Sequence, residues 1–289
     1  MEPNQNPPSS MPVSVYTPES RLRRPKVLFE EIWSDLKVSR ELSWELFRRQ
    51  LSARYRQTAL GPLWVLVPPV VTALMATLLR GSGVVTASDD DVLPYPLRVF
   101  FASVVWGVFA QSLVLPLKAM ADSLTILRTM RVSVEGFLLA KVGEILFDQG
   151  VQFIILFVLF LVLKVPISAV GVLISALLVA ILIALGMSLG FFLVPIGSLY
   201  LDVNSAIPFL LRGWFFLTPI IYSPPTRYPY SLIADFNPVT PLLQGILDTT
   251  TGQPLLNGWS IIGVLIFTLI LFGLGWIIYR VSIPLLVER

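Results

Sequence analysis

Six long apolar segments, with lysines and arginines gathered at alternate ends of them, constrain this chain more than any other feature. The segments begin near Gly61, Val99, Val142, Ser168, Ser205 and Trp259. Each approaches or exceeds the roughly 20 residues that a helix needs to cross a bilayer. In addition, 55% of the residues are hydrophobic and only 13% are charged. A water-soluble domain of this length cannot bury so much apolar surface, so we predict an all-α membrane protein with six transmembrane helices.

The basic residues divide unevenly between the two sides of these segments. Sixteen of them precede the first segment, connect the second to the third, or follow the sixth. Only four fall on the other side, together with an acidic run at 89–91: Arg80, Arg98, Lys164 and Arg227. Because cytoplasmic loops carry the excess of lysine and arginine, we expect a multi-pass protein with both termini in the cytoplasm.

Several function classes are excluded by residues that the sequence lacks. It has no cysteine and no histidine, which removes thiolate metal sites and the commonest general base. Glu144 and Asp148 lie near Lys141, a spacing that predicts a solvated mouth with local ion pairs. No G-x-x-x-x-G-K-[ST] phosphate loop occurs. We therefore predict a transport protein rather than an enzyme, with no cofactor or metal in this chain, driven if at all by ATP on another polypeptide.

Ahead of the first span, two regions differ in composition. Residues 1–27 are rich in proline, serine and arginine and predict a disordered cytoplasmic tail. Residues 28–60 predict an amphipathic helix, since Trp44, Phe47, Leu51 and Tyr55 share one face and arginines occupy the rest. We expect this helix to lie in the inner headgroup layer beside membrane lipids; packing on a soluble partner is the alternative, and both can hold. Because the net charge is +3 and the basic residues lie at the membrane surface, nucleic acid is not an expected partner.

Residues 61–289 form the predicted membrane domain, and two of its spans are irregular. The first contains Pro68 and Pro69, which leave backbone carbonyls for a neighbouring helix or a wet cavity to satisfy. The fourth, near residues 168–199, is too long for a straight perpendicular helix, and its Gly186, Gly190 and Pro195 predict a tilt, a kink or emergence into the cytoplasm.

Two connections between spans have helical or mixed patterns. The cytoplasmic one, near residues 118–141, predicts a short amphipathic helix that offers a soluble partner its contact residues: Leu127, Arg128, Arg131 and Glu135. The external one, at 223–258, is too apolar for a free loop and too broken by proline and glycine to span. Re-entrant helices between the fifth and sixth spans fit it best, with candidate gate residues at their turn: Asn237, Pro238 and Pro241.

The sequence leaves more than one role for two features of the fifth span, an arginine and a run of aromatic residues. Arg212 lies well inside an apolar segment, where insertion of an arginine costs about 2.5–3.5 kcal/mol. It either pairs with Asp202 or a carbonyl, snorkels to the inner interface, or meets an anionic substrate. The aromatic run Trp214, Phe215 and Phe216 either packs against other helices or lines a path along which sugar rings slide.

Taken together, three stretches of the sequence resemble a known family. They are the basic segment from Arg54 to Trp64 followed by Pro68, the pair of motifs at 200–203 and 218–222, and the Asn237 to Pro241 turn. These stretches are similar to the permease subunits of ATP-binding-cassette exporters that move lipid-linked polysaccharides such as O-antigen, capsular polysaccharide and teichoic acid. The resemblance extends over about residues 35–280.

The resemblance implies a homodimer in a bacterial inner membrane, docked on two copies of a separate ATP-binding subunit that holds ATP and magnesium. The first and fifth spans would line a central channel, the cytoplasmic connection would contact the ATPase, and the re-entrant segment would gate the outer end. The channel candidates are Trp64, Thr72, Arg212, Trp214, Phe215, Phe216 and Tyr222. An exporter of small drugs or lipids, a partner-independent secondary transporter and a structural scaffold are the alternatives.

Overall fold

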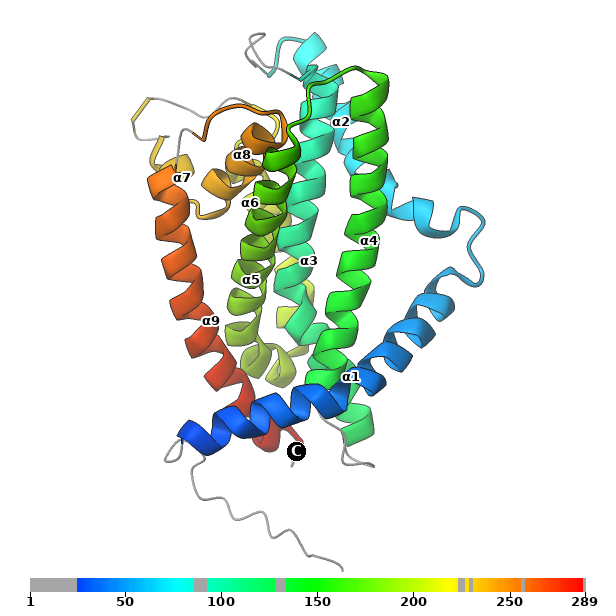
Figure 1. The fold of residues 1–289 in the computed structure, drawn as a ribbon, viewed down its shortest axis with the longest axis vertical. Coiled ribbons are helices and arrows are strands. Elements are labelled where there is room, and N and C mark those ends of the chain that lie inside the picture. The colour runs from blue at the N-terminus through cyan, green and yellow to red at the C-terminus, as the bar shows by residue number, and fades with distance from the viewer. Residues whose placement is uncertain are drawn as a thin grey trace, which may run out of the picture.

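The computed structural model describes residues 25–85, 93–127, 134–222, 227–228, 231–255 and 258–287, and their regular structure is helical. The elements are α1 (Pro25–Tyr55), the 3-10 helix η2 (Gly61–Leu66), α2 (Val67–Gly81), α3 (Tyr95–Leu127), α4 (Val134–Val162), α5 (Ala169–Leu199), α6 (Leu201–Leu217), α7 (Ser231–Asp235), α8 (Val239–Thr250) and α9 (Gly258–Val287). Helices α3, α4, α5 and α9 run along the long axis of the molecule (Figure 1). Helix α1 lies across one end of this bundle, the α1 end, and α7 and α8 lie at the other, the α8 end.

Within the described residues, five helical segments are long and apolar enough to cross a membrane: Gly61–Gly81, Tyr95–Ser123, Val134–Val162, Ala169–Leu199 and Gly258–Ile283. They correspond to the first four predicted spans and the last one, which confirms a multi-pass, all-helical membrane protein in the described part of the chain. The predicted fifth span instead forms α6, a helix of 17 residues. It is shorter than the length that a crossing normally requires.

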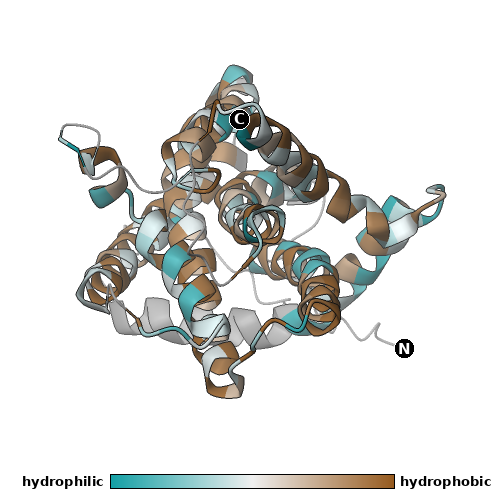
Figure 2. Cartoon of the chain, turned by 90° about the horizontal axis from the view of Figure 1, so that it is seen from above, coloured by the Kyte–Doolittle hydropathy of each residue, from teal (hydrophilic) through white to brown (hydrophobic). Residues whose placement is uncertain are grey.

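Hydrophobic residues cover the outside of the bundle as well as its interior (Figure 2). Leu173 of α5 is 73% exposed and Ile154 of α4 is 65% exposed. Contiguous apolar surface of this kind is rare on soluble monomers. In a bilayer it faces hydrocarbon, where no hydrophobic penalty applies.

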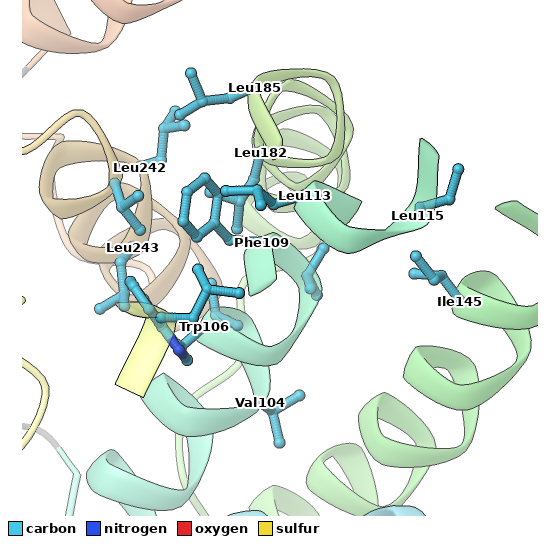
Figure 3. Packing of buried hydrophobic residues seen from close by; sticks show 14 of the residues in the cluster. Val104, Trp106, Phe109, Leu113, Leu115, Ile145, Leu182, Leu185, Leu242 and Leu243 are labelled. Carbon is cyan, nitrogen blue, oxygen red and sulfur yellow. The ribbon is translucent and has the colours of Figure 1, made fainter. Parts of the chain in front are cut away.

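The core lies between α3, α5 and α8, where Phe109, Leu182 and Leu242 are fully buried (Figure 3). Two glycines allow α5 to approach α3 closely. A Cβ atom added at Gly186 would lie 2.8 Å from the Phe109 carbonyl oxygen, and one at Gly190 would collide with the Leu113 carbonyl. Small residues at helix interfaces permit such backbone contact in membranes. These two glycines therefore serve helix packing, and α5 continues unbroken through them to Leu199.

Helix α1 packs on α4, a partner that the sequence pattern did not reveal. A Cβ atom added at Gly143 would lie 3.0 Å from the Phe47 ring, and the rings of Tyr55 and Phe147 are 6.1 Å apart. Phe47 and Tyr55 share the buried face as predicted, but Trp44 is 61% exposed. The aromatic face of α1 is thus largely occupied by the protein's own α4.

The prolines at the start of the first span are accommodated as predicted, by a neighbouring helix. Pro69 has no N–H to donate to the Val65 carbonyl four residues earlier. The Gln152 amide of α4 donates to that carbonyl instead, at 2.5 Å. The Trp64 carbonyl, which Pro68 leaves free, accepts from the Val67 N–H in the 3-10 turn. Both interruptions of the helical ladder are therefore satisfied.

We predict that Gln152→Leu lowers the free energy of unfolding by about 1–3 kcal/mol, because it leaves the Val65 carbonyl without its donor. Thermal unfolding of the purified protein in detergent measures this. Gln149→Leu is the matched control: Gln149 is buried on the same helix, and its amide has no hydrogen-bond partner among the described residues. Equal losses in the two variants would show that the Gln152 bond contributes nothing.

Candidate translocation pathway

Helix α6 has one buried and one exposed face. Ile207, Leu211 and the following Thr218 are buried, at spacings of four and seven residues. The opposite stripe is exposed and consists of Ser205, Phe209, Arg212 and Phe216. Phe209 is 74% exposed and Phe216 is 64% exposed. Aromatic and polar side chains therefore alternate along this stripe, and the exposed Leu210 and Leu217 lie beside it.

Arg212 lies in the middle of this stripe. Its side chain is exposed and has no ion-pair or hydrogen-bond partner among the described residues. The pairing with Asp202 that we considered does not form; Asp202 is exposed at the α1 end of the same helix. A guanidinium group on a lipid-facing surface is unfavourable, so this face of α6 requires water or another molecule against it.

The three consecutive aromatic residues of α6 divide between the two faces. Trp214 lies 5.1 Å from Phe109 and 6.3 Å from Trp106, measured between ring centroids, in edge-to-face geometry. Phe215 lies 5.8 Å from Trp106. These two candidates thus pack against α3 inside the protomer. Phe216 alone of the three points outward.

Asn237 joins α6 to α8 at the α8 end of the bundle. Its side-chain oxygen accepts from Trp214 Nε1 at 3.2 Å and from the Val239 backbone N–H at 3.1 Å, and its amide donates to the Thr218 hydroxyl at 2.8 Å. Asn237 is buried. The turn that the sequence predicted between two short helices therefore exists, and Asn237 holds it against α6.

The other two gate candidates belong to this turn. Pro238 precedes the first residue of α8 and is half-buried, and Pro241 is buried within its first turn. The far end of α8 is anchored on α5, where the Ser175 hydroxyl lies 2.6 Å from the Thr249 hydroxyl and donates to the Ile246 carbonyl. Helix α8 is therefore held at both of its ends.

At the α8 end, Tyr95 of α3 connects Arg80 of α2 with the segment that follows α6. The Tyr95 hydroxyl donates to the Ile221 carbonyl at 2.7 Å, and the Arg80 guanidinium lies 4.6 Å above the Tyr95 ring. Next to this contact, the Tyr222 hydroxyl donates to the Phe216 carbonyl at 3.0 Å. Tyr222 thus caps the end of α6 instead of standing free.

The candidates on the first span lie in η2 and α2. Trp64 is 52% exposed in η2. Thr72 is half-buried in α2 and donates its hydroxyl to the Pro68 carbonyl at 2.9 Å. Much of the apolar surface of α2 is exposed, for example at Leu74 and Leu78. Like α6, α2 leaves a broad face open for another surface.

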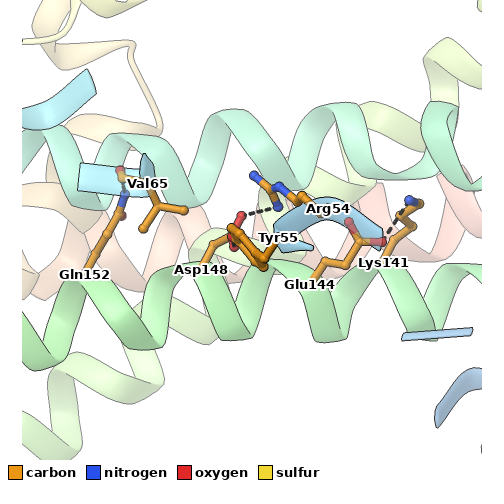
Figure 4. Close-up of polar contacts among 7 residues, drawn as sticks. All are labelled: Arg54, Tyr55, Val65, Lys141, Glu144, Asp148 and Gln152. Atoms are coloured by element: carbon orange, nitrogen blue, oxygen red, sulfur yellow. Dashed lines mark hydrogen bonds and ion pairs between the residues drawn. The ribbon is translucent and has the colours of Figure 1, made fainter. Parts of the chain in front are cut away.

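Near the middle of α4, an ion pair holds the C-terminal end of α1 to this helix (Figure 4). The Arg54 guanidinium lies 2.7 Å from an Asp148 carboxylate oxygen, and the Tyr55 hydroxyl donates to the other oxygen at 2.9 Å. Burial and this hydrogen bond raise the pKa of Tyr55 to about 12, so its hydroxyl stays protonated and donates at neutral pH. Asp148 itself is buried, contrary to the solvated mouth that we expected.

Its neighbour Glu144 does take part in the local ion pair that the spacing predicted. The Lys141 ammonium lies 2.8 Å from Glu144 and 2.9 Å from Asp122. Because Asp122 belongs to α3, this ammonium also joins α3 to α4.

Only part of the predicted cytoplasmic contact lies within the described residues. Leu127 is the last residue of α3, and Arg128 and Arg131 lie outside the described ranges. Glu135, in the first turn of α4, is buried, and its carboxylate lies 2.6 Å from the Arg280 guanidinium of α9. Its carboxylate therefore faces the protein interior, where a soluble partner does not reach it directly.

We predict that Asn237→Ala lowers the free energy of unfolding by about 2–4 kcal/mol, because three buried hydrogen bonds are lost. Thr218→Val is the comparison: it keeps the shape of the side chain but removes the bond from the Asn237 amide and the bond that the Thr218 hydroxyl donates to the Trp214 carbonyl, and should cost about 1–2 kcal/mol. Thermal unfolding in detergent compares the two. If Asn237→Ala were no less stable than Thr218→Val, Asn237 would not fasten α6 to α8.

Comparison with known proteins agrees with the architecture. A family model described as "ABC-2 type transporter" matches residues 41–251, which include α2 through α8. A search of curated proteins finds no significant match. The matched region is well over half of the chain. This chain therefore belongs to the ABC-2 type transporter family, as a transport permease without an ATPase domain, of the kind that pairs with ATP-binding subunits.

Proposed function

We propose that this chain is the membrane subunit of a bacterial ABC exporter that moves a lipid-linked polysaccharide from the cytoplasm across the inner membrane. Two copies would form the conduit, with η2, α2 and α6 from each as its walls. The observation that carries the proposal is the exposed stripe of α6, where Phe209 and Phe216 alternate with Ser205 and Arg212. Such a mixed face is unfavourable against lipid, but it is well suited to form the wall of a water-filled path.

The proposal requires α6 to be a sixth crossing. Its first turn is tied to the α1 end, where the Asn204 amide donates to the Gly197 carbonyl of α5. The segment after it reaches the α8 end, where Ile221 accepts from Tyr95. Its 17 residues measure about 26 Å, and the chain from Thr218 to Ile221 adds the remainder. This path supports six crossings with both termini cytoplasmic.

A glycan fits the stripe better than a small apolar molecule does. Aromatic faces stack on sugar rings without requiring one particular linkage, and a sliding polymer needs such tolerance. Arg212 adds a cation to the wall, which suits an anionic group such as a carrier diphosphate. An exporter of lipids or hydrophobic drugs would have little use for this charge.

Energy would come from ATP and magnesium on a partner subunit. ABC-2 permeases pair with ATP-binding subunits, and this sequence contains no phosphate-binding loop of its own. We assign the docking surface to the connection between α3 and α4, with Leu127, Arg128 and Arg131 as its contact residues. Glu135 would then support this surface from inside the protein.

The outer gate would consist of α7 together with the turn at Asn237 and Pro238, and Pro241 would lie where the gate meets α8. Helix α8, anchored on α5 through Ser175, would form its fixed base. Opening would then move α7, whose Leu232 and Ile233 are exposed, while Thr218 and Ile220 keep the segment after α6 packed in the core.

We predict that deleting the genes for this chain and its ATP-binding partner abolishes surface glycan and causes lipid-linked polymer to accumulate inside the cell. Immunoblotting of surface glycan and extraction of the lipid-linked pool measure the two quantities. Restoring both genes should restore export. Normal surface glycan in the deletion strain would rule out the proposed substrate class.

We also predict that Phe216→Ala or Arg212→Gln slows export, each by about tenfold if a contact of about 1.4 kcal/mol with the moving polymer is lost. Phe157→Ala is the control, because Phe157 is an exposed phenylalanine on α4 (52%, against 64% for Phe216), away from the proposed conduit. Arg212→Lys should retain more export than Arg212→Gln. Similar export from Phe216→Ala and Phe157→Ala would exclude the α6 stripe as the conduit wall.

A further inference from the structure

Gln149 is a buried glutamine near the middle of the membrane-spanning segment Val134–Val162, and it is 3% exposed. Neither its Oε1 nor its Nε2 has a hydrogen-bond partner among the described residues. Asp148, the residue before it, is already bonded to Arg54 and Tyr55. Because a buried amide without a partner is costly, we expect another group that can form hydrogen bonds beside Gln149.

A second amide, from α3, lies next to the same place. A Cβ atom added at Gly107 of α3 would lie 3.7 Å from Gln149 Nε2 and 4.0 Å from Gln111 Nε2. Apart from its chain neighbours and the backbone of α3, no other atom of the described residues comes within 4 Å of that point. The two amides therefore border a space that a methyl group would enter in ordinary van der Waals contact. A water molecule is no larger than a methyl group, so it fits there too.

Helix α3 has one partly exposed stripe, and this space lies on it. Between residues 99 and 117, every residue of α3 is buried except four. These four form the α3 stripe, since spacings of three and four residues place them on one face: Gly107, Ala110, Gln111 and Val114. On one side of the stripe, Trp106 packs against α6, and on the other Gly107 faces Gln149 of α4. The α3 stripe thus gives access to Gly107 from between α4 and α6.

We propose that water enters the bundle along the α3 stripe and is bound at Gly107 by the amides of Gln111 and Gln149. A glutamine amide both donates and accepts, and a buried water makes about three hydrogen bonds in proteins, so the two amides together can hold it. Bound water would then satisfy Gln149 at a depth where lipid offers no partner. This inference goes beyond the proposed function, because it requires neither a glycan nor an ATP-binding subunit, and it adds α3 to the helices that face water.

Gly107→Ala and Gly107→Ser test whether the two amides need a polar partner. Both variants fill the same space, and they differ by one hydroxyl. Alanine is the better helix former, so in a dry space Gly107→Ala would be at least as stable as Gly107→Ser. We expect Gly107→Ser to unfold at the higher temperature in detergent, because its hydroxyl replaces the water that a methyl group only displaces. In a Gln149→Leu background this advantage of serine should disappear, since leucine needs no partner.

Thiol labelling tests the access of water, because the chain has no cysteine of its own. The probe is a methanethiosulfonate reagent with a permanent charge, applied to single-cysteine variants of the full chain in lipid nanodiscs. Thiols react as thiolates, which form in water and not in hydrocarbon. We expect Gln111→Cys to react at least about tenfold faster than two controls. Leu146→Cys lies on the surface of α4 and is 55% exposed, and Ser112→Cys lies next to Gln111 but is fully buried.

The two experiments can each overturn the inference. Labelling of Gln111→Cys as slow as that of both controls would show that water does not enter along the α3 stripe. A Gly107→Ser variant no more stable than Gly107→Ala would contradict binding at Gly107, and an advantage of serine that survives in Gln149→Leu would exclude Gln149 from the site. If Gln111→Cys does not fold, Val114→Cys on the same stripe takes its place with the same expectation. Neither experiment measures export, so their outcomes are independent of the deletion strain that tests the proposed function.

Discussion

Inside a bilayer no water is available to satisfy a backbone group or a charge, and the architecture of this chain depends on side chains that take over that role. Pro69 removes a donor from the first span, and Gln152 of α4 replaces it. The turn before α8 breaks the helical ladder, and its own Asn237 bonds to the first residue of α8 and to Trp214 of α6. Irregular backbone is thus placed where a side-chain amide reaches it, from another helix in the first case and from the turn itself in the second.

Charged side chains in the first half of α4 also find their partners on neighbouring helices. Asp148 forms an ion pair with Arg54 of α1, and Lys141 forms one with Asp122 of α3. Glu135 forms one with Arg280 of α9. The helices that an ATP-binding partner would approach are therefore joined through one element, whereas α2 and α6 touch the rest of the protomer along a single face. Helices joined through α4 at one end, with α2 and α6 held along one face only, suit a proposed conduit that has to widen.

The sequence predicted the membrane class, five of the spans and the turn at Asn237, because apolar length and proline placement are local properties of the chain. It did not predict the partners of α4. Arg54 and Asp148 are 94 residues apart, so their pairing depends on how the helices assemble. From the sequence, Gly186 indicates a tilt, a kink or emergence of its span into the cytoplasm, whereas its role in packing depends on the closeness of α3. The exposed stripe of α6 could not be predicted either, because a pattern of aromatic residues does not indicate which of them faces inward.

The shortness of α6 has a consequence for the proposed sixth crossing. Its 17 residues cover less than a typical hydrocarbon layer, so the non-helical segment from Thr218 to Ile221 would complete the passage. Backbone at that depth has to be satisfied by protein, because lipid offers no hydrogen-bond partner. The Thr218 N–H donates to the Trp214 carbonyl and the Ile221 carbonyl accepts from Tyr95, so these two bonds become a condition for the crossing itself.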